Sequence, residues 1–201
     1  MVYLGRNDQL GITYSCHAPN AKELVCYADS NWSTMRSTTG FVIFLAGAAI
    51  SFVSRRQHCI TMSSCEAELV ALADCAIELI FIKEVLEFIG NKFDGPIKCY
   101  TDNKAAYDLC HRFNSAQNSR HIDRKQFKMR ELRGQGVVEV VKVHTDDNPA
   151  DLFTKVLKGP AFIKHRRTCM NLPGDVGQDR MTGSSQRESG NVPARSALAR
   201  A

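Results

Sequence analysis

The sequence lacks any apolar run near the roughly 20 residues that a membrane-spanning helix needs. Its opening residues, MVYLGRND, do not form a basic segment followed by an apolar stretch, so we see no signal peptide and expect a cytoplasmic or nuclear protein without membrane contact. The eight cysteines include no C-x-x-C pair, and no histidine pair stands at zinc-finger spacing. We therefore expect reduced, structural thiols and no zinc site. Apolar residues still make up 44%, enough for the core of one domain.

Positive charge is concentrated in two parts of the chain, whose net charge is +5. Residues 161–201 hold seven Lys/Arg and three Asp/Glu, and residues 104–133 hold eight Lys/Arg and three Asp/Glu. The excess over 104–133 is compatible both with a surface that binds a phosphate backbone and with a solvated helix face. Charge alone does not separate these two interpretations.

Apolar periodicity predicts alternating strands and helices. We expect strands at 22–29, 39–45, 49–53, 97–101 and 137–144, and helices at 66–89, 104–113, 121–133 and from Asn148-Pro149 onward. Gly47 between the second and third strands predicts a hairpin. After about residue 172 the chain is rich in Gly, Ser, Arg and Gln without a period, which predicts disorder. The order predicts an α/β fold, a mixed five-stranded sheet flanked by helices.

Acidic residues stand where the predicted structure changes. Asp29 ends a predicted strand, Glu68 lies in the first turn of a predicted helix, and Asp102 directly follows another strand. Such positions gather at one rim of an α/β sheet. Asp151 opens the predicted last helix. Carboxylate oxygens suit Mg²⁺ or Mn²⁺, and two such ions about 4 Å apart can activate a water and stabilise the leaving oxygen of a phosphodiester. Acids also commonly end strands and begin helices, so position alone does not decide.

Six short motifs follow one another in order: YADSNW at 27–32, RSTTGF at 36–41, SSCEAELVAL at 63–72, YTDNKAA at 100–106, RHID at 120–123 and DNPADLFTK at 147–155. Over residues 22–157 the chain closely resembles the ribonuclease H domain of copia-type retrotransposon (retrovirus-related) Pol polyproteins. The resemblance implies a ribonuclease H-like fold and endonucleolytic cleavage of RNA in RNA–DNA hybrids with two Mg²⁺ or Mn²⁺ ions. We expect such a domain to act as a monomer.

The resemblance places the family's four metal-binding, catalytic acids on Asp29, Glu68, Asp102 and Asp151. Glu66 is a second possibility for the glutamate. Comparison with other ribonucleases H, whose acid precedes a leucine in a helix, favours Glu68. Glu66 then becomes a residue of the helix N-terminus, where the helix dipole favours an acid.

Five other residues are predicted to contact the substrate. His144 precedes Asp151 by seven residues, as the mobile histidine of cellular ribonucleases H precedes their last aspartate. We prefer the simpler interpretation that this histidine ends a strand. The remaining candidates belong to the basic stretch that would hold the hybrid's backbone: Lys104, Arg120, His121 and Arg124.

The resemblance also divides the chain into three parts. Residues 1–20 resemble the segment that joins reverse transcriptase to ribonuclease H. Residues 21–158 form the ribonuclease H-like domain, and residues 159–201 form a C-terminal extension. The chain is then a fragment, whose former partner is the reverse transcriptase of the same polyprotein.

Two departures from the family pattern favour an alternative function. Only Ser33-Thr34-Met35 separates Trp32 from Arg36, where the family usually has more residues, and Asn31 stands where the family often has a second acid. The alternative is a catalytically dead or co-opted fragment that only binds nucleic acid. A minor alternative is a secreted effector, because 130–133 (RELR) matches the R-x-L-R pattern of oomycete effectors, although it lies inside a predicted helix. Integrase-like chemistry is disfavoured, because the motifs are those of ribonuclease H.

Overall fold

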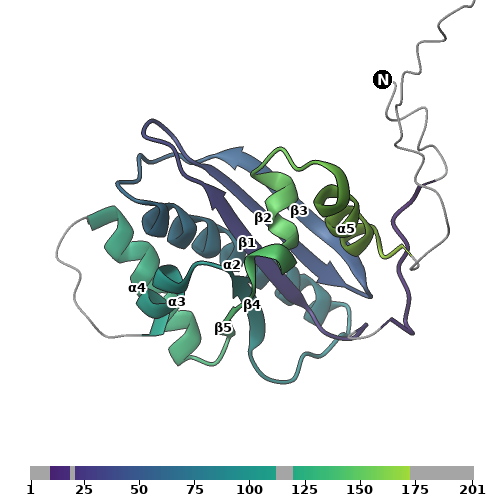
Figure 1. Ribbon diagram of the computed structural model, residues 1–201. Coiled ribbons are helices and arrows are strands. Elements are labelled where there is room, and N and C mark those ends of the chain that lie inside the picture. The colour runs from purple at the N-terminus through teal and green to yellow at the C-terminus, as the bar shows by residue number, and fades with distance from the viewer. Residues whose placement is uncertain (1–9, 19–20, 112–119, 173–201) are drawn as a thin grey trace, which may run out of the picture.

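The computed structural model describes residues 10–18, 21–111 and 120–172, without the side chains of 120–123. Its centre is one sheet in the order β3-β2-β1-β4-β5 (Figure 1). The strands are β1 (Val25–Asn31), β2 (Thr38–Leu45), β3 (Ala48–Arg56), β4 (Ile97–Thr101) and β5 (Val138–Lys142). The strand pairs β1–β2 and β2–β3 are antiparallel, whereas β4 runs parallel to both β1 and β5. The predicted mixed five-stranded sheet is confirmed.

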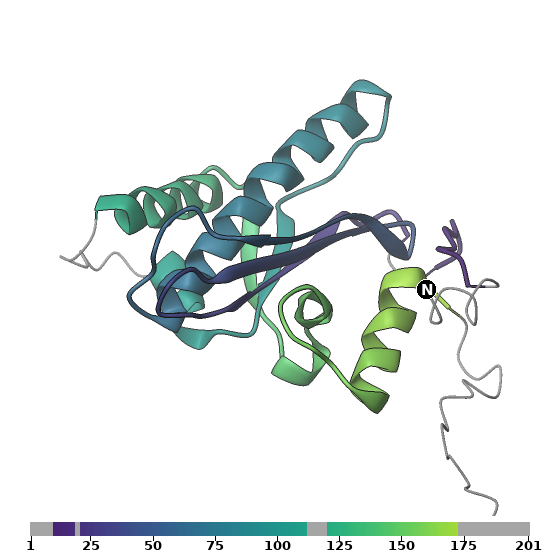
Figure 2. The ribbon, with the colours of Figure 1, turned by 90° about the horizontal axis from the view of Figure 1, so that it is seen from above.

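Helices cover both faces of this sheet (Figure 2). The longest, α2, crosses one face, and η2 and α5 lie against the other. The helical elements are α2 (Ser64–Phe88), α3 (Lys104–His111), α4 (Arg120–Gly134), η1 (Thr145–Asp147), η2 (Pro149–Phe153) and α5 (Gly159–Met170), where η denotes a 3-10 helix. In the part of the chain that the structure describes, no helix is both long and apolar enough to cross a membrane.

Two apolar clusters follow from this arrangement. The larger one joins α2 to the sheet and reaches α4 through Met129, and the smaller one contains Val42, Ala150 and Cys169 from β2, η2 and α5. Because β2 faces both clusters, six successive residues of it are buried. The hairpin predicted at Gly47 is confirmed: Ala46 and Gly47 both have positive φ, the backbone that a two-residue hairpin turn requires.

The C-terminal third differs from the sequence prediction. The helix expected from Asn148-Pro149 is the single 3-10 turn η2, and a separate helix, α5, follows it. The sequence analysis did not predict α5, because its buried face includes His165 and Arg166 and so shows no clear apolar period. Main-chain bonds join the N-terminal segment to this region: Thr13 N–H donates to Met170 O at 3.0 Å.

Several predicted boundaries also shift. Strand β1 runs two residues past Asp29, so this acid lies inside the strand rather than at its end. Helix α2 begins at Ser64, which puts Glu68 in the second turn rather than the first. Strand β5 ends at Lys142, two residues before His144. The predicted end of the helix at 104–113 and the predicted disorder after 172 lie outside the described residues.

Candidate metal centre

Three of the four predicted acids meet at one rim of the sheet. Asp29 comes from β1, Glu68 from α2, and Asp102 from the residue directly after β4. One carboxylate oxygen of each lies within 4.8 Å of those of the other two. Strands β1 and β4 are parallel neighbours, so their carboxyl ends bring two of the acids together, and the second turn of α2 brings the third.

The donor set of this group fits a hard divalent cation. Asp29 is 1% exposed and Glu68 is 6% exposed. Oε1 of Glu68 accepts a hydrogen bond from Ser30 N–H at 3.2 Å, whereas its buried Oε2 has no hydrogen-bond partner among the described residues. A buried acceptor without a donor costs about 1–3 kcal/mol. A cation shared by the three carboxylates would supply the missing partner.

Burial and mutual repulsion make these carboxylates hard to ionise without a cation. Burial raises the pKa of Glu68 to about 9, and the nearby charges of Asp29 and Asp102 add to the rise. Burial also raises the pKa of Asp29 to about 6, although the Thr154 hydroxyl and the Lys155 ammonium oppose the rise. A bound divalent cation would lower both pKa values, because it favours the ionised carboxylates.

The fourth acid, Asp151, belongs to a different set of contacts. It lies in η2, is 7% exposed and does not join the group of three. Nζ of Lys155 lies 2.8 Å from Oδ1 of Asp151 and 3.4 Å from Oδ1 of Asp29, so an ammonium connects these two acids. The Thr154 hydroxyl donates a hydrogen bond to the other oxygen, Oδ2, of Asp29. Burial would lower the pKa of Lys155, but the carboxylates of Asp151 and Asp29 raise it.

Two residues hold η2 against the sheet beside Asp29. Nδ2 of the fully buried Asn148 donates to Ala28 O at 3.1 Å. Gly40 pairs with Asp29 across β1 and β2, and a Cβ at this glycine would lie 2.4 Å from Cγ2 of Thr154. Only a glycine permits η2 to approach this closely.

The sequence analysis assigned no site role to these supporting residues: Gly40, Asn148, Thr154 and Lys155. The signal that could have found them is their position inside the motifs at 36–41 and 147–155.

The two candidate glutamates have different surroundings. Oε2 of Glu66 accepts from Met62 N–H at 2.6 Å, while Glu66 N–H donates to Oγ of the N-cap Ser63 at 3.2 Å. This reciprocal pattern resembles a capping box and stabilises the start of α2. Glu68 lies two residues further along α2, about 200° around the helix axis from Glu66. Its carboxylate therefore points elsewhere, and it belongs to the group of three.

The predicted substrate contacts lie around the site in different ways. Lys104 is exposed at the first residue of α3, two residues after Asp102. Arg124 is exposed on α4 and lines a groove together with Arg55 and Lys125. Both of these neighbours pair with Asp74, at 3.1 Å and 2.5 Å, so their charge is partly neutralised. The side chains of the candidates Arg120 and His121 lie outside the described residues.

The exposed His144 has a local structural role. It directly precedes η1, and its Nδ1 accepts a hydrogen bond from Asp146 N–H at 3.3 Å. The ring therefore caps the 3-10 turn that leads into η2. The simpler interpretation, that His144 ends a strand, does not match this position, because β5 stops at Lys142 and His144 begins the following turn.

The R-x-L-R segment is part of the packing between α3 and α4. Nε of Arg130 donates to Leu109 O at 2.9 Å, and Nη1 of Arg133 donates to Cys110 O at 3.4 Å. Leu132 is 4% exposed and belongs to the larger apolar cluster. The two arginines thus bind main-chain carbonyl groups in the last turn of α3, and Leu132 packs in the core.

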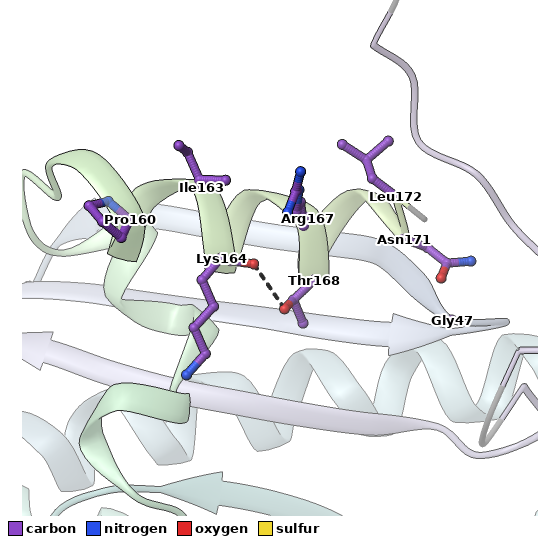
Figure 3. Close-up of a pocket in the computed structure, with 8 residues that line it drawn as sticks. All are labelled: Gly47, Pro160, Ile163, Lys164, Arg167, Thr168, Asn171 and Leu172. Atoms are coloured by element: carbon purple, nitrogen blue, oxygen red, sulfur yellow. Dashed lines mark hydrogen bonds between the residues drawn. The ribbon is translucent and has the colours of Figure 1, made fainter. Parts of the chain in front are cut away.

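An open hollow lies elsewhere on the molecule, between α5 and the β2–β3 turn (Figure 3). Its lining includes Ile163, Lys164 and Gly47 and none of the four acids. The ammonium of Lys164 lies 2.5 Å from a carboxylate oxygen of Asp147 and 2.7 Å from Asp146 O, so it is already paired. The residues that line this hollow include no carboxylate that could join a metal centre.

Comparison with known proteins finds transposon relatives. The chain is 33% identical over 127 residues, 63% of its length, to the retrovirus-related Pol polyprotein from transposon TNT 1-94 of Nicotiana tabacum. It is 32% identical over 152 residues, 74% of its length, to that from transposon RE2 of Arabidopsis thaliana. The chain spans about a tenth of the length of these relatives, since each match covers 10% of them. It is also 32% identical over 84 residues to secreted RxLR effector protein 161 of Plasmopara viticola, covering 40% of this chain and 58% of that protein.

Solved structures with a related arrangement include two ribonuclease H domains. The N-terminal ribonuclease H domain of a Mycobacterium tuberculosis protein has a TM-score of 0.49 and 12% identity, covering 73% of this chain and 97% of that one. LC11-RNase H1 in complex with an RNA/DNA hybrid has a TM-score of 0.48 and 13% identity, covering 65% and 93%. No model of a protein family matches the chain.

Proposed function

From the chain's homology to a segment of copia-type retrovirus-related Pol polyproteins, and from its ribonuclease H-like fold, we propose that it is a metal-dependent ribonuclease H. It cleaves the RNA strand of RNA–DNA hybrids endonucleolytically. The observation that supports this most directly is the meeting of Asp29, Glu68 and Asp102 from three distant segments, where one buried oxygen of Glu68 lacks a donor among the described residues.

Two Mg²⁺ or Mn²⁺ ions would be held by the four predicted acids, namely Asp29, Glu68, Asp102 and Asp151. Bound ions of this kind activate a water molecule and stabilise the oxygen that leaves phosphorus. The chain's own contribution is to fix the carboxylates before substrate arrives. Ser30 N–H orients the Glu68 carboxylate, and the Thr154 hydroxyl orients Asp29.

The residues predicted to contact the substrate lie outside the group of three acids. Lys104 and Arg124 are exposed cations near the acids or along α4, and we propose that they bind phosphates of the hybrid. Such contacts carry no sequence information, so selection for a hybrid rests on its shape and on the 2′-OH. Arg120, His121 and His144 remain further candidates for contact with the strand.

The test is digestion of an end-labelled RNA–DNA hybrid in Mg²⁺ by the wild-type chain and by Asp102→Asn. We expect a loss on the order of a hundredfold or more in the variant, because it removes one charged ligand. Glu66→Gln, prepared in the same way, is the matched control and should retain cleavage. Equal cutting by wild type and Asp102→Asn would exclude this centre and would point to a contaminating nuclease.

A second candidate function is binding of nucleic acid without cleavage. One observation favours it: the ammonium of Lys155 already neutralises the Asp29–Asp151 pair. In this case the chain should bind the hybrid, show no cleavage and gain no thermal stability from Mn²⁺. The effector alternative has no comparable support in the structure, because Arg130, Leu132 and Arg133 serve the packing of α4 on α3.

We further propose how this segment relates to its polyprotein relatives. Residues 1–20 correspond to the connection to reverse transcriptase, which is the former partner of this segment. The ribonuclease H-like domain starts at about residue 21 and, because α5 packs against η2 and the sheet, extends beyond 158 to about residue 172. We expect the domain to act as a monomer in the cytoplasm or nucleus.

A further inference from the structure

We propose that Lys155 is a resident cation of the carboxylate centre, whose ammonium holds the position between Asp29 and Asp151 that a second divalent ion would need. The centre then has one strong divalent position, at Asp29, Glu68 and Asp102, and one conditional position that is available only when Lys155 moves away. This inference rests on the proposed function, because it assigns the order in which that centre accepts ions.

The first argument is the geometry of the ammonium. Lys155 stands four residues after Asp151, and its Nζ contacts one oxygen each of Asp151 and Asp29, at 2.8 Å and 3.4 Å. The side chains of these acids are 10% and 2% exposed, so the two negative charges are almost removed from water. Removal of the ammonium would leave two nearly buried carboxylates without their counter-charge, which is unfavourable.

The second argument is the contrast with the Glu68 side of Asp29. There, Oε2 of Glu68 is buried and receives no hydrogen bond from the described residues. Among the described residues, Glu68 therefore has no positive partner, whereas the Asp29–Asp151 pair has one in Lys155. A divalent ion binds most favourably where the carboxylates have no positive partner. At the Asp29–Asp151 pair it must compete with the ammonium of Lys155.

The chemistry of an ammonium explains why this matters for the reaction. An ammonium offers one positive charge and three hydrogen-bond donors, but it has no open coordination position at which a water could be activated. Lys155 is thus a positioning residue, which contacts both Asp29 and Asp151 and offsets part of their negative charge. The Lys155 side chain is 37% exposed, and its ammonium stands at the end of a flexible four-carbon stem. The ammonium can therefore move into solvent when an ion displaces it.

The experiment is a Mn²⁺ titration of the folded chain, with free Mn²⁺ measured by electron paramagnetic resonance. We expect wild type to bind one Mn²⁺ strongly and a second at least about tenfold more weakly, a gap of about 1.4 kcal/mol. Lys155→Met should strengthen the second site about tenfold and change the first by less than about threefold. Lys155→Arg keeps the charge and should resemble wild type.

Two controls make the result specific. Lys158→Met removes an exposed lysine of the same segment and should leave both affinities unchanged. Lys155→Gln repeats the charge removal with a polar side chain, in case Lys155→Met does not fold, as checked by circular dichroism in EDTA.

The possible failures are distinguishable. If wild type and Lys155→Met both bind two Mn²⁺ ions with equal affinity, the inference is overturned and the proposed function stands. If the titration gives the expected pattern but the hybrid is not cleaved, the proposed function fails and the role of Lys155 stands. If neither protein binds Mn²⁺, both are wrong.

Discussion

Asp29 has two sides that differ in what compensates its charge. On the Glu68 side it meets two further carboxylates, and a buried oxygen of Glu68 lacks a hydrogen-bond donor among the described residues. On the Asp151 side it meets the hydroxyl of Thr154 and the ammonium of Lys155. The proposed metal centre on the first side would take its cation from solution, whereas the second side has the ammonium of Lys155. One aspartate thus belongs both to a site that is poised for a metal and to an ion pair that is complete.

The difference follows from how the two sides are built. On the Asp151 side, the residues that interact with Asp29 come from one short segment, because Asp151, Thr154 and Lys155 lie within five residues of one another. The Glu68 side is assembled from three elements that are far apart in the chain. A local segment can include its own counter-charge at helical spacing, but a site made of distant elements gathers like charges that only a bound ion compensates.

The largest expected effect comes from removing the charge on the Glu68 side. With Glu68→Gln we expect hybrid cleavage to fall on the order of a hundredfold, because the strong ion position loses a ligand. In EDTA the same variant should be more stable than wild type by about 1–3 kcal/mol, because a buried carboxylate without a full set of partners is replaced by an amide. The hybrid-cleavage assay measures the first change, and urea unfolding in EDTA measures the second. A variant that is destabilised in EDTA would contradict this account of the Glu68 side.

The second prediction concerns the Asp151 side alone. Gly40→Ala should destabilise the fold by about 1–3 kcal/mol, because the new methyl group lies too close to Thr154 and pushes η2 away from β2. The strong Mn²⁺ position should survive, since the atoms nearest to the new methyl group belong to Ala150, Phe153 and Thr154 rather than to Glu68 or Asp102. Chemical unfolding and a Mn²⁺ titration of the same sample separate these effects. Gly134→Ala, at a glycine with open space around it, is the matched control.

The third prediction is a pH dependence that comes from the Glu68 side. Burial raises the pKa of Glu68 from 4.5 to about 9, and the pKa of Asp29 from 3.8 to about 6. Between its unfolded and its folded pKa, each of these groups holds a proton in the folded chain and has lost it in the unfolded chain. The free energy of unfolding in EDTA should therefore fall as pH rises through this interval.

We expect this fall to be about 2–3 kcal/mol between pH 6 and pH 8, because one extra proton on the folded chain corresponds to about 1.4 kcal/mol per pH unit. Glu68→Gln should flatten it, and saturating Mn²⁺ should reverse it, because the ion binds the ionised carboxylates. Thermal unfolding at several pH values is the measurement. An unchanged slope in Glu68→Gln would show that other groups cause the dependence.

The smallest expected effect sharpens the distinction between the two glutamates. Glu66→Gln should cost about 0.5–1 kcal/mol, because it weakens the bond to Met62 N–H at the start of α2. Mn²⁺ affinity should remain within about twofold of wild type. Loss of the strong Mn²⁺ position in this variant would assign the metal to Glu66 instead.

Much of the fold follows from patterns that are local in the sequence. The strands, the hairpin at Gly47 and the long helix α2 were predicted from apolar periodicity and turn residues, with boundaries shifted by a few residues. Helix α5 could not be predicted in this way. Its buried positions include His165 and Arg166, whose burial depends on the sheet and η2 beside them rather than on their own hydrophobicity.

The candidate site divides in the same manner. Asp29, Asp102 and Asp151 were found from strand ends and motifs, and Glu68 was preferred over Glu66 by comparison with a family pattern. No local pattern predicted that Lys155 contacts Asp29, because these residues are 126 positions apart. The close approach at Gly40 has the same origin, since the glycine matters only once η2 lies on β2.

The sequence by itself determined the types of element, the six motifs and the acids that a metal centre could use. The tertiary structure decided which acids lie together, which glutamate joins them and that a lysine contacts both Asp29 and Asp151. The physical reason is the distance over which each property is determined. Backbone conformation depends on neighbours within a few residues along the chain. The charge balance of a buried carboxylate, by contrast, depends on every group that the fold brings within a few ångströms of it.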